Sequence, residues 1–152
     1  MMITDYDPLI VLNEKISTVN DKIQLETTQA RKFLNELFSQ PHKVPYIRKK
    51  YCEVCLARHV SFEGHHYSGI KHDHKQITVC IPCHNTLTQR QTLWDSRWWS
   101  DTDSEFLKLS FLYRGVHDIL QLISEKRQNS LYSDIAKSII PVTSYLQNGA
   151  QN

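Results

Sequence analysis

Two Cys-x-x-Cys pairs are the residues of this chain best suited to chemistry. The pairs are Cys52-Cys55 and Cys80-Cys83, and 24 residues separate them. Each pair can place two thiolates on one tight turn, and two such turns complete the tetrahedron that Zn²⁺ prefers. We therefore predict a structural Zn²⁺ site made by all four cysteines of the chain. The alternative is a pair of disulfides or four unrelated thiols, because the cysteine count alone also allows those arrangements.

Histidines are concentrated in the same segment. Six of the eight histidines lie between Cys52 and His84, including the doublet His65-His66, and His84 directly follows Cys83. A neutral imidazole titrates near neutrality, so it can serve as a general base or bind a divalent cation. A four-thiol site needs no imidazole. These histidines could therefore form a second, open metal site.

Three stretches carry a family resemblance: CEVC at 52–55, EGHHYSG at 63–69 and TVCIPCHNTLT at 78–88. Residues 50–90 resemble the HNH endonucleases, the ββα-metal nucleases with a treble-clef zinc finger, in their four-cysteine form. The resemblance implies a zinc-stapled β-hairpin followed by a helix, and the hydrolysis of DNA phosphodiester bonds. It makes His66 the general base, and it makes His65 and His84 the ligands of a catalytic Mg²⁺ or another divalent metal.

Two positions differ from the pattern of many family members. Residues 71–75 stand where an asparagine is common, and Thr88 stands where a further histidine or asparagine is common. A third metal ligand would then come from Asp73, His74 or Asn85, or from water. Each key histidine also has a structural alternative: His65 could pack near the zinc, His66 could be a buried hydrogen-bonding residue, and His84 could replace a thiolate. Of the remaining histidines, His72 and His74 are expected to be solvated loop residues, and His42, His59 and His117 are expected to be structural or exposed.

Positive charge accompanies the cysteines and histidines. Residues 40–99 carry nine basic and four acidic side chains, a net charge of +5, whereas the whole chain has +2. Such a local excess favours a polyanionic partner, and DNA is the one expected here. A solvated basic surface would have the same composition. The candidate phosphate contacts are Arg48, Lys49, Lys50, Lys71, Lys75 and Arg90.

A heptad pattern runs along the N-terminal part. Asp7 and Pro8 form a helix start, with Asp7 as the N-cap. Residues 9–39 contain no proline or glycine. They predict one long helix that ends before Pro41. This helix could pack on its own domain, or it could be a coiled-coil arm of a homodimer. The seam positions are Leu9, Leu12, Ile16, Val19, Ile23, Glu26, Ala30, Phe33 and Leu37.

The C-terminal part is predicted to be helical. The capping box Thr102-x-x-Glu105 opens a largely apolar helix, and a further helix begins near Ser130 and is interrupted around Pro141. Before these helices, Trp94, Trp98 and Trp99 lie within six residues. Such a cluster belongs in a core, or it stacks on bases.

The patterns together predict an α+β protein that is mostly α. The expected parts are residues 1–41 as the long helix, 42–100 as the HNH-like module and 101–152 as the helical segment. The first 12 residues lack a basic side chain, and the longest apolar run is only Leu9–Leu12. We therefore expect a soluble, cytoplasmic protein with no membrane partner. A non-catalytic zinc module that binds nucleic acid or protein is the alternative function, and a helical adaptor with a zinc clip is a third.

Overall fold

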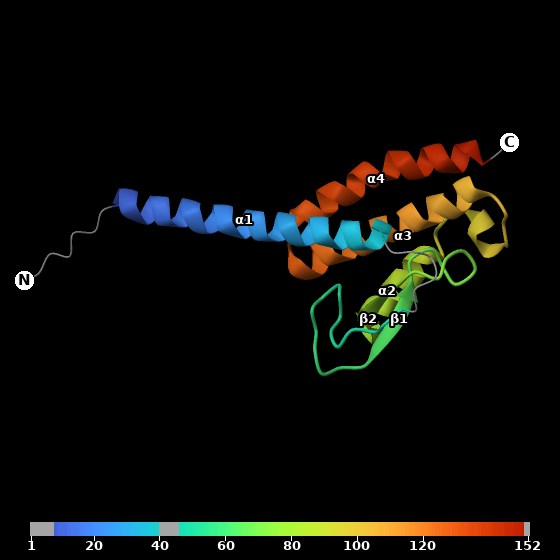
Figure 1. Cartoon of the computed structure of the whole chain (residues 1–152), viewed down its shortest axis with the longest axis horizontal. Coiled ribbons are helices and arrows are strands. Elements are labelled where there is room, and N and C mark those ends of the chain that lie inside the picture. The colour runs from blue at the N-terminus through green and yellow to red at the C-terminus, as the bar shows by residue number, and fades with distance from the viewer. Residues whose placement is uncertain (1–7, 40–45, 151–152) are drawn as a thin grey trace, which may run out of the picture. The chain divides into compact units, whose positions relative to one another are not determined.

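The computed structural model describes residues 8–39 and 46–150, with the backbone alone for residues 37–39 (Figure 1). The chain divides into two compact units. The first unit, residues 1–40, contains helix α1 (Pro8–Ser39). The second unit, residues 41–152, contains all the other elements. The expected module at 42–100 and the helical segment at 101–152 therefore fall within one compact unit. In chain order its elements are β1 (Phe62–His66), β2 (Gln76–Cys80), α2 (Ile81–Gln91), the 3₁₀ helix η1 (Ser96–Trp99), α3 (Glu105–Arg127) and α4 (Ser130–Gly149).

Helix α1 is a single helix of 32 residues. It lacks the residues that break helices, and it ends two residues before Pro41, so the prediction of one long helix is confirmed. The predicted N-cap, Asp7, lies outside the described residues.

Strands β1 and β2 form the predicted hairpin. They pair in antiparallel fashion, and the register places Phe62 opposite Cys80 and His66 opposite Gln76. Side chains alternate between the two faces of a strand, so Glu63 and His65 share one face of β1 while His66 leaves from the other. The hairpin therefore directs the side chains of His65 and His66 to opposite faces of β1.

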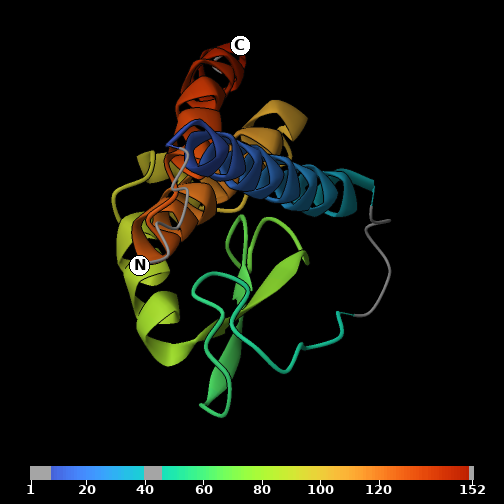
Figure 2. The ribbon, with the colours of Figure 1, turned by 90° about the vertical axis from the view of Figure 1, so that its left-hand side faces the viewer.

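Helix α2 follows β2 without a loop. Cys80 is both the last residue of β2 and the N-cap of α2, and Pro82 lies in the first turn, where its missing N–H costs nothing. The helix packs against both strands and against α3 (Figures 1 and 2). Its buried face includes Cys83 and Leu87. This arrangement places the second Cys-x-x-Cys pair at the junction of strand and helix.

Helix α3 begins later than the predicted capping box implies. Ser104 is the N-cap, and its hydroxyl accepts a hydrogen bond from the N–H of Leu107. Glu105 is then the first helical residue, and Thr102 instead accepts from the N–H of Ser104. The capping box prediction is therefore wrong by two residues. The helix is otherwise buried along much of its length, as its apolar sequence predicts.

Helix α4 is continuous through Pro141, so the predicted interruption is wrong. Pro141 is exposed, and buried residues lie on both sides of it, with Ala136 before and Thr143 after. The α4 helix packs along α3, so tertiary contacts hold both halves in line despite the missing N–H. The hydroxyl of Thr143 donates to the carbonyl of Ile139 and satisfies one acceptor near the proline.

The tryptophans hold the loop of the hairpin against α3. Trp94 is buried and stacks with Phe111, whereas Trp98 is half-buried and Trp99 is exposed. The indole N–H of Trp98 donates to the carbonyl of Ser68, and its ring lies where a side chain at Gly69 would be. Gly69 also has a φ of +86°, which favours glycine. Trp94 and Trp98 therefore serve the core.

The fold is α+β and mostly helical, with a small two-stranded antiparallel sheet. None of the helices in the described ranges combines the length and the apolar character needed to cross a membrane.

Candidate metal centre and histidine cluster

The four cysteines converge on one point between the hairpin and α2. Their sulfur atoms all lie within 4.8 Å of one another, and none forms a disulfide. Cys55 and Cys80, one from each pair, have their sulfurs 3.6 Å apart. Four thiols at this spacing could hold a metal ion. Within the part of the chain that the structure describes, this is the only group of three or more metal-binding side chains that close together.

Backbone hydrogen bonds shape the first Cys-x-x-Cys turn. The N–H of Leu56 donates to the carbonyl of Cys52, and the N–H of Cys55 points at the sulfur of Cys52 from 3.4 Å. Leu56 has a φ of 66°, the left-handed conformation that closes such a turn. Glu53 then ties the turn to β2, because its N–H donates to the carbonyl of Thr78 and its carboxylate accepts from the N–H of Thr78.

The thiols already favour ionisation at one position. A hydrogen bond from Cys83 lowers the pKa of the Cys52 thiol to about 4, and the same bond raises the pKa of Cys83. Burial raises the pKa of Cys55. A cation at the centre would replace the shared protons and favour the thiolate at every ligand.

Arg127 holds the first Cys-x-x-Cys turn from the far end of α3. Its guanidinium donates to the carbonyls of Glu53 (2.6 Å) and Val54 (2.8 Å), the two residues between the paired cysteines. The same group lies over the ring of Tyr132 at the start of α4. The planar guanidinium can satisfy two carbonyls at once, which an ammonium group cannot do in the same geometry. Arg127 thereby links the first Cys-x-x-Cys turn to helices α3 and α4.

We expect the substitution Arg127→Ala to lower the free energy of unfolding by about 2–3 kcal/mol, because it removes two charge-assisted hydrogen bonds. The measurement is chemical denaturation of the metal-loaded protein. The matched control is Lys126→Ala, which removes the preceding basic side chain, one that is exposed. Equal losses in the two variants would contradict a specific role for the two hydrogen bonds.

His65 and His84 meet beside the cysteine cluster, one from β1 and the other from α2. Their ring centroids are 5.4 Å apart, and the rings are nearly perpendicular. His65 is buried, whereas His84 is half-buried. The Nδ1 atom of His84 lies 3.2 Å from a carboxylate oxygen of Glu63, which shares the His65 face of β1. A hydrogen bond from Nδ1 to Glu63 leaves Nε2 of His84 with a free lone pair for a cation.

His66 leaves β1 on the opposite face, and its ring is oriented by the hairpin loop. The Nδ1 atom of His66 lies 3.2 Å from the backbone carbonyl of Asp73. A carbonyl can only accept, so Nδ1 carries the proton and Nε2 is left as a base. The carbonyl of His66 in turn accepts from the side chain of Gln91 on α2. Both the ring and the backbone of His66 are therefore held in place.

Of the other loop residues, His72 differs from its prediction. It is half-buried, its Nε2 bonds the carbonyl of Trp98, and its ring lies against Phe111. It is a structural residue and not a solvated one. Of the three residues named as possible third ligands, Asp73 accepts a hydrogen bond from the N–H of Lys75, and His74 and Asn85 are exposed. Within the described residues, neither Asp73 nor His74 forms a possible metal-binding group with His65 and His84.

Burial and charge keep His65 neutral. Burial is the main cause that lowers the pKa of His65 to about 4, and the neighbouring imidazoles of His84 and His66 lower it further. The carboxylate of Asp118 acts in the opposite direction and does not offset them. A neutral imidazole is the form that binds a cation.

We expect His65 to make the protein less stable in acid. The unfolded chain binds a proton at His65 near pH 6.5 but the folded chain only near pH 4, so the unfolding free energy falls as the pH drops between these values, by up to about 3 kcal/mol. Urea titrations at pH 7, 6 and 5 measure this slope. Since the cysteine cluster also takes up protons in acid, the comparison is with a His65→Gln variant, which should show a shallower slope. Parallel slopes would contradict the prediction.

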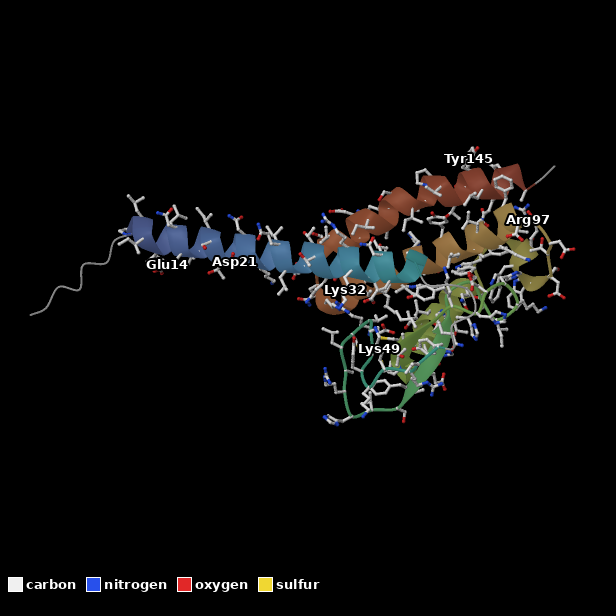
Figure 3. The ribbon with its side chains drawn as sticks, in the orientation of Figure 1. Glu14, Asp21, Lys32, Lys49, Arg97 and Tyr145 are labelled. Atoms are coloured by element: carbon white, nitrogen blue, oxygen red, sulfur yellow. The ribbon has the colours of Figure 1, made fainter. Side chains whose placement is uncertain are left out.

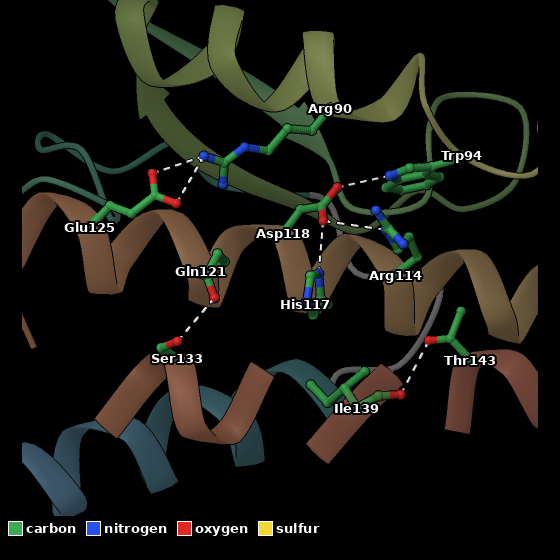
Figure 4. Close-up of polar contacts among 10 residues, drawn as sticks. All are labelled: Arg90, Trp94, Arg114, His117, Asp118, Gln121, Glu125, Ser133, Ile139 and Thr143. Atoms are coloured by element: carbon green, nitrogen blue, oxygen red, sulfur yellow. Dashed lines mark hydrogen bonds and ion pairs between the residues drawn. The ribbon is translucent and has the colours of Figure 1, made fainter. Parts of the chain in front are cut away.

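Asp118 is a buried carboxylate on α3 that contacts Trp94, Arg114 and His117 (Figure 4). It accepts a hydrogen bond from the indole N–H of Trp94 at 2.8 Å, and it pairs with Nδ1 of His117 and with Arg114. His117 is therefore structural, as expected. The network is fully explained by packing between the end of α2 and α3.

The six basic residues named as phosphate contacts are not equally available. Arg90 is paired with both carboxylate oxygens of Glu125 (Figure 4), and Lys49 is paired with Glu53. Lys71 donates to the carbonyl of Trp99, and Arg48 donates to that of Phe62. These four groups would have to exchange a protein partner for a phosphate. The other two differ in burial, since Lys50 is exposed and Lys75 is half-buried.

The sequence patterns missed two residues of this site. Glu63 could have been found, because a residue two positions before His65 must share its face of a strand. Arg127 could not, since nothing in the sequence links the end of α3 to a turn 74 residues earlier. Comparisons with protein-family models, with curated proteins and with solved structures find no match to this chain.

Proposed function

We propose that the second unit is an HNH-like, metal-dependent endonuclease that hydrolyses DNA phosphodiester bonds. The observation that carries the proposal is the position of the histidines: His65 from the hairpin and His84 from the following helix lie together beside a four-cysteine cluster. A hairpin, a helix and this pair of imidazoles are the parts that the resemblance implies. The cysteine cluster, the His65–His84 pair and His66 have separate roles in this proposal.

The cysteine cluster is assigned a structural Zn²⁺. Four thiolates make a closed tetrahedral site, and Zn²⁺ is the common ion in such sites. Cys52 and Cys83 are almost fully buried, so the ion would have no open position for a substrate. Its role is to hold the hairpin against α2.

The pair His65 and His84 is assigned the catalytic divalent metal, Mg²⁺ or another. Two imidazoles leave most of the coordination sphere to water and to the oxygens of the scissile phosphate. Such a metal, when bound, stabilises negative charge on the phosphate and on the leaving oxygen. Glu63 is assigned a positioning role, because its carboxylate orients His84 through Nδ1.

His66 is assigned the role of general base. Its Nδ1 is bonded to the carbonyl of Asp73, so Nε2 can take a proton from the attacking water. The side chains of His66 and His65 lie on opposite faces of β1. A phosphate that contacts both must therefore bind at the end of the strand. This end lies where β1 gives way to the loop at Tyr67.

The experiment that tests the proposal is plasmid nicking by the purified full chain with Mg²⁺, Mn²⁺ or Ni²⁺. We expect nicking that depends on the added metal and ceases with a chelator that leaves the structural Zn²⁺ in place. DNA retained in a gel shift with no nicking under any of the three metals would reject the nuclease.

One observation favours a second candidate, a non-catalytic zinc module that binds nucleic acid. In the described parts of the chain, His65, His84 and Glu63 do not come as close to one another as the cysteines do. A site with only two ligands holds a metal weakly. The binding module would give the gel shift without the nicking.

We expect Glu63→Ala to raise the concentration of Mn²⁺ needed for half-maximal nicking by about 10- to 100-fold, the usual effect of removing a group that orients a metal-bound histidine. Direct titration of Mn²⁺ should show the same shift. Glu63→Gln keeps an acceptor for Nδ1 and should have a smaller effect. Unchanged Mn²⁺ affinity in Glu63→Ala would contradict the positioning role.

A further inference from the structure

Helix α1 presents a stripe of large apolar side chains to water. The first five seam positions of its heptad are between 50% and 67% exposed: Leu9, Leu12, Ile16, Val19 and Ile23. Glu14 and Asp21 are outside these five positions, and they lie seven residues apart on one side of the helix (Figure 3). A contiguous stripe of this kind, rimmed by polar residues, is typical of an interaction surface.

We propose that this stripe pairs with the same stripe of a second copy of the chain, as an antiparallel coiled coil. The helix is 32 residues long, about 48 Å at 1.5 Å per residue, and a 3.5-residue apolar repeat runs along it with Glu26 as its one polar position. A repeat of this kind fits another helix with the same repeat. The proposal is independent of the nuclease, since it concerns the first unit alone.

Glu26 argues against a parallel pair. It occupies a seam position, and in a parallel, in-register dimer each Glu26 would face Glu26 of the second copy in the same layer. Two like charges directly opposed in a partly desolvated seam are unfavourable. The seam consists of two heptad positions: one set is Leu9, Ile16, Ile23, Ala30 and Leu37, and the other set is Leu12, Val19, Glu26 and Phe33. In an antiparallel pair each layer combines one residue from each set, so Ile23 of the second copy can face each Glu26.

The charges beside the seam select the antiparallel register. Four residues directly precede members of the Leu9 set and flank the seam: Lys15, Lys22, Gln29 and Glu36. When Ile23 faces Glu26 of the second copy, Lys15 lies beside Glu36 of that copy, twice by symmetry. A shift by one heptad in one direction would place Lys22 against Lys22, and a shift in the other direction would pair Lys22 with Glu36 but leave Leu12 and Ile16 beyond the end of the second helix. In a parallel pair Lys15 would face Asn20, and no charge pair would form.

The experiment is sedimentation equilibrium of the full chain, which should show a monomer–dimer equilibrium. The variant Ile16→Asn/Val19→Asn removes two seam residues and should weaken dimerisation by more than 100-fold. The control Ile10→Asn/Leu25→Asn removes two side chains of matching exposure, 57% and 59%, that lie outside the seam, and should remain dimeric. A wild-type chain that stays monomeric, or equal losses in the two variants, would overturn the proposal.

Orientation is tested with charge reversals. Lys15→Glu alone and Glu36→Lys alone should each weaken the dimer about fivefold, the size expected for two exposed ion pairs. The double variant should recover the wild-type affinity, because each reversed charge again faces its opposite. A double variant as weak as the two losses combined would overturn the antiparallel arrangement.

Discussion

Replacement of a single cysteine, Cys83→Ser, is expected to abolish the folded state of the hairpin and α2. Structural Zn²⁺ sites contribute about 10–16 kcal/mol of apparent binding free energy, and a whole domain is stable by only about 5–15 kcal/mol. Cys83 is almost fully buried, so a serine there can neither hold the metal well nor fill the space of the sulfur. We expect a purified variant without stoichiometric zinc and without a cooperative transition for this region.

Three measurements check this expectation. Metal analysis reports the zinc content, thermal unfolding reports cooperativity, and near-ultraviolet circular dichroism reports Trp98, which is held by the hairpin loop. The matched control is Ser61→Ala, an exposed position outside the cluster, which should match the wild type in all three. A metal-free Cys83→Ser protein that melts like the wild type would show that the cysteines do not hold the fold through a metal.

The second large effect is expected for His66→Ala, which should reduce the rate of nicking by about 10²- to 10⁴-fold, the usual contribution of a general base. The imidazole contacts the loop through a single hydrogen bond to Asp73, so its loss should cost only about 1 kcal/mol of stability. DNA affinity in a gel shift should be unchanged.

The control for His66→Ala is His74→Ala. His74 is an exposed histidine on the same hairpin loop, so it reports any general effect of removing an imidazole there. Its rate should match that of the wild type. A His66→Ala protein that keeps the wild-type rate would contradict the role of His66 and leave the metal to activate the water.

Local spacing predicted the elements that carry the site. Two Cys-x-x-Cys pairs predicted the cysteine cluster, because a spacing of two residues can place both sulfurs of a pair on the same side of the chain, and the structure brings all four sulfurs together. The family resemblance implied the hairpin, and the heptad with no proline or glycine in residues 9–39 predicted α1. The interruption predicted at Pro141 was wrong for a non-local reason. Pro141 is tolerated because α4 packs along α3 on both sides of it, which a propensity rule for a single helix cannot include.

The sequence by itself determined which residues could do chemistry: four thiols in two turns, a histidine doublet on a strand and a histidine at the start of a helix. Only the tertiary structure decided how they are used. It buried His65 and left His84 half-buried. It placed the carboxylate of Glu63 beside His84 and the carbonyl of Asp73 beside His66. It also brought Arg127 to the first Cys-x-x-Cys turn. The reason is physical: the pattern of a strand or helix is set by near neighbours, whereas burial, charge and hydrogen-bond partners depend on the segments that pack against it.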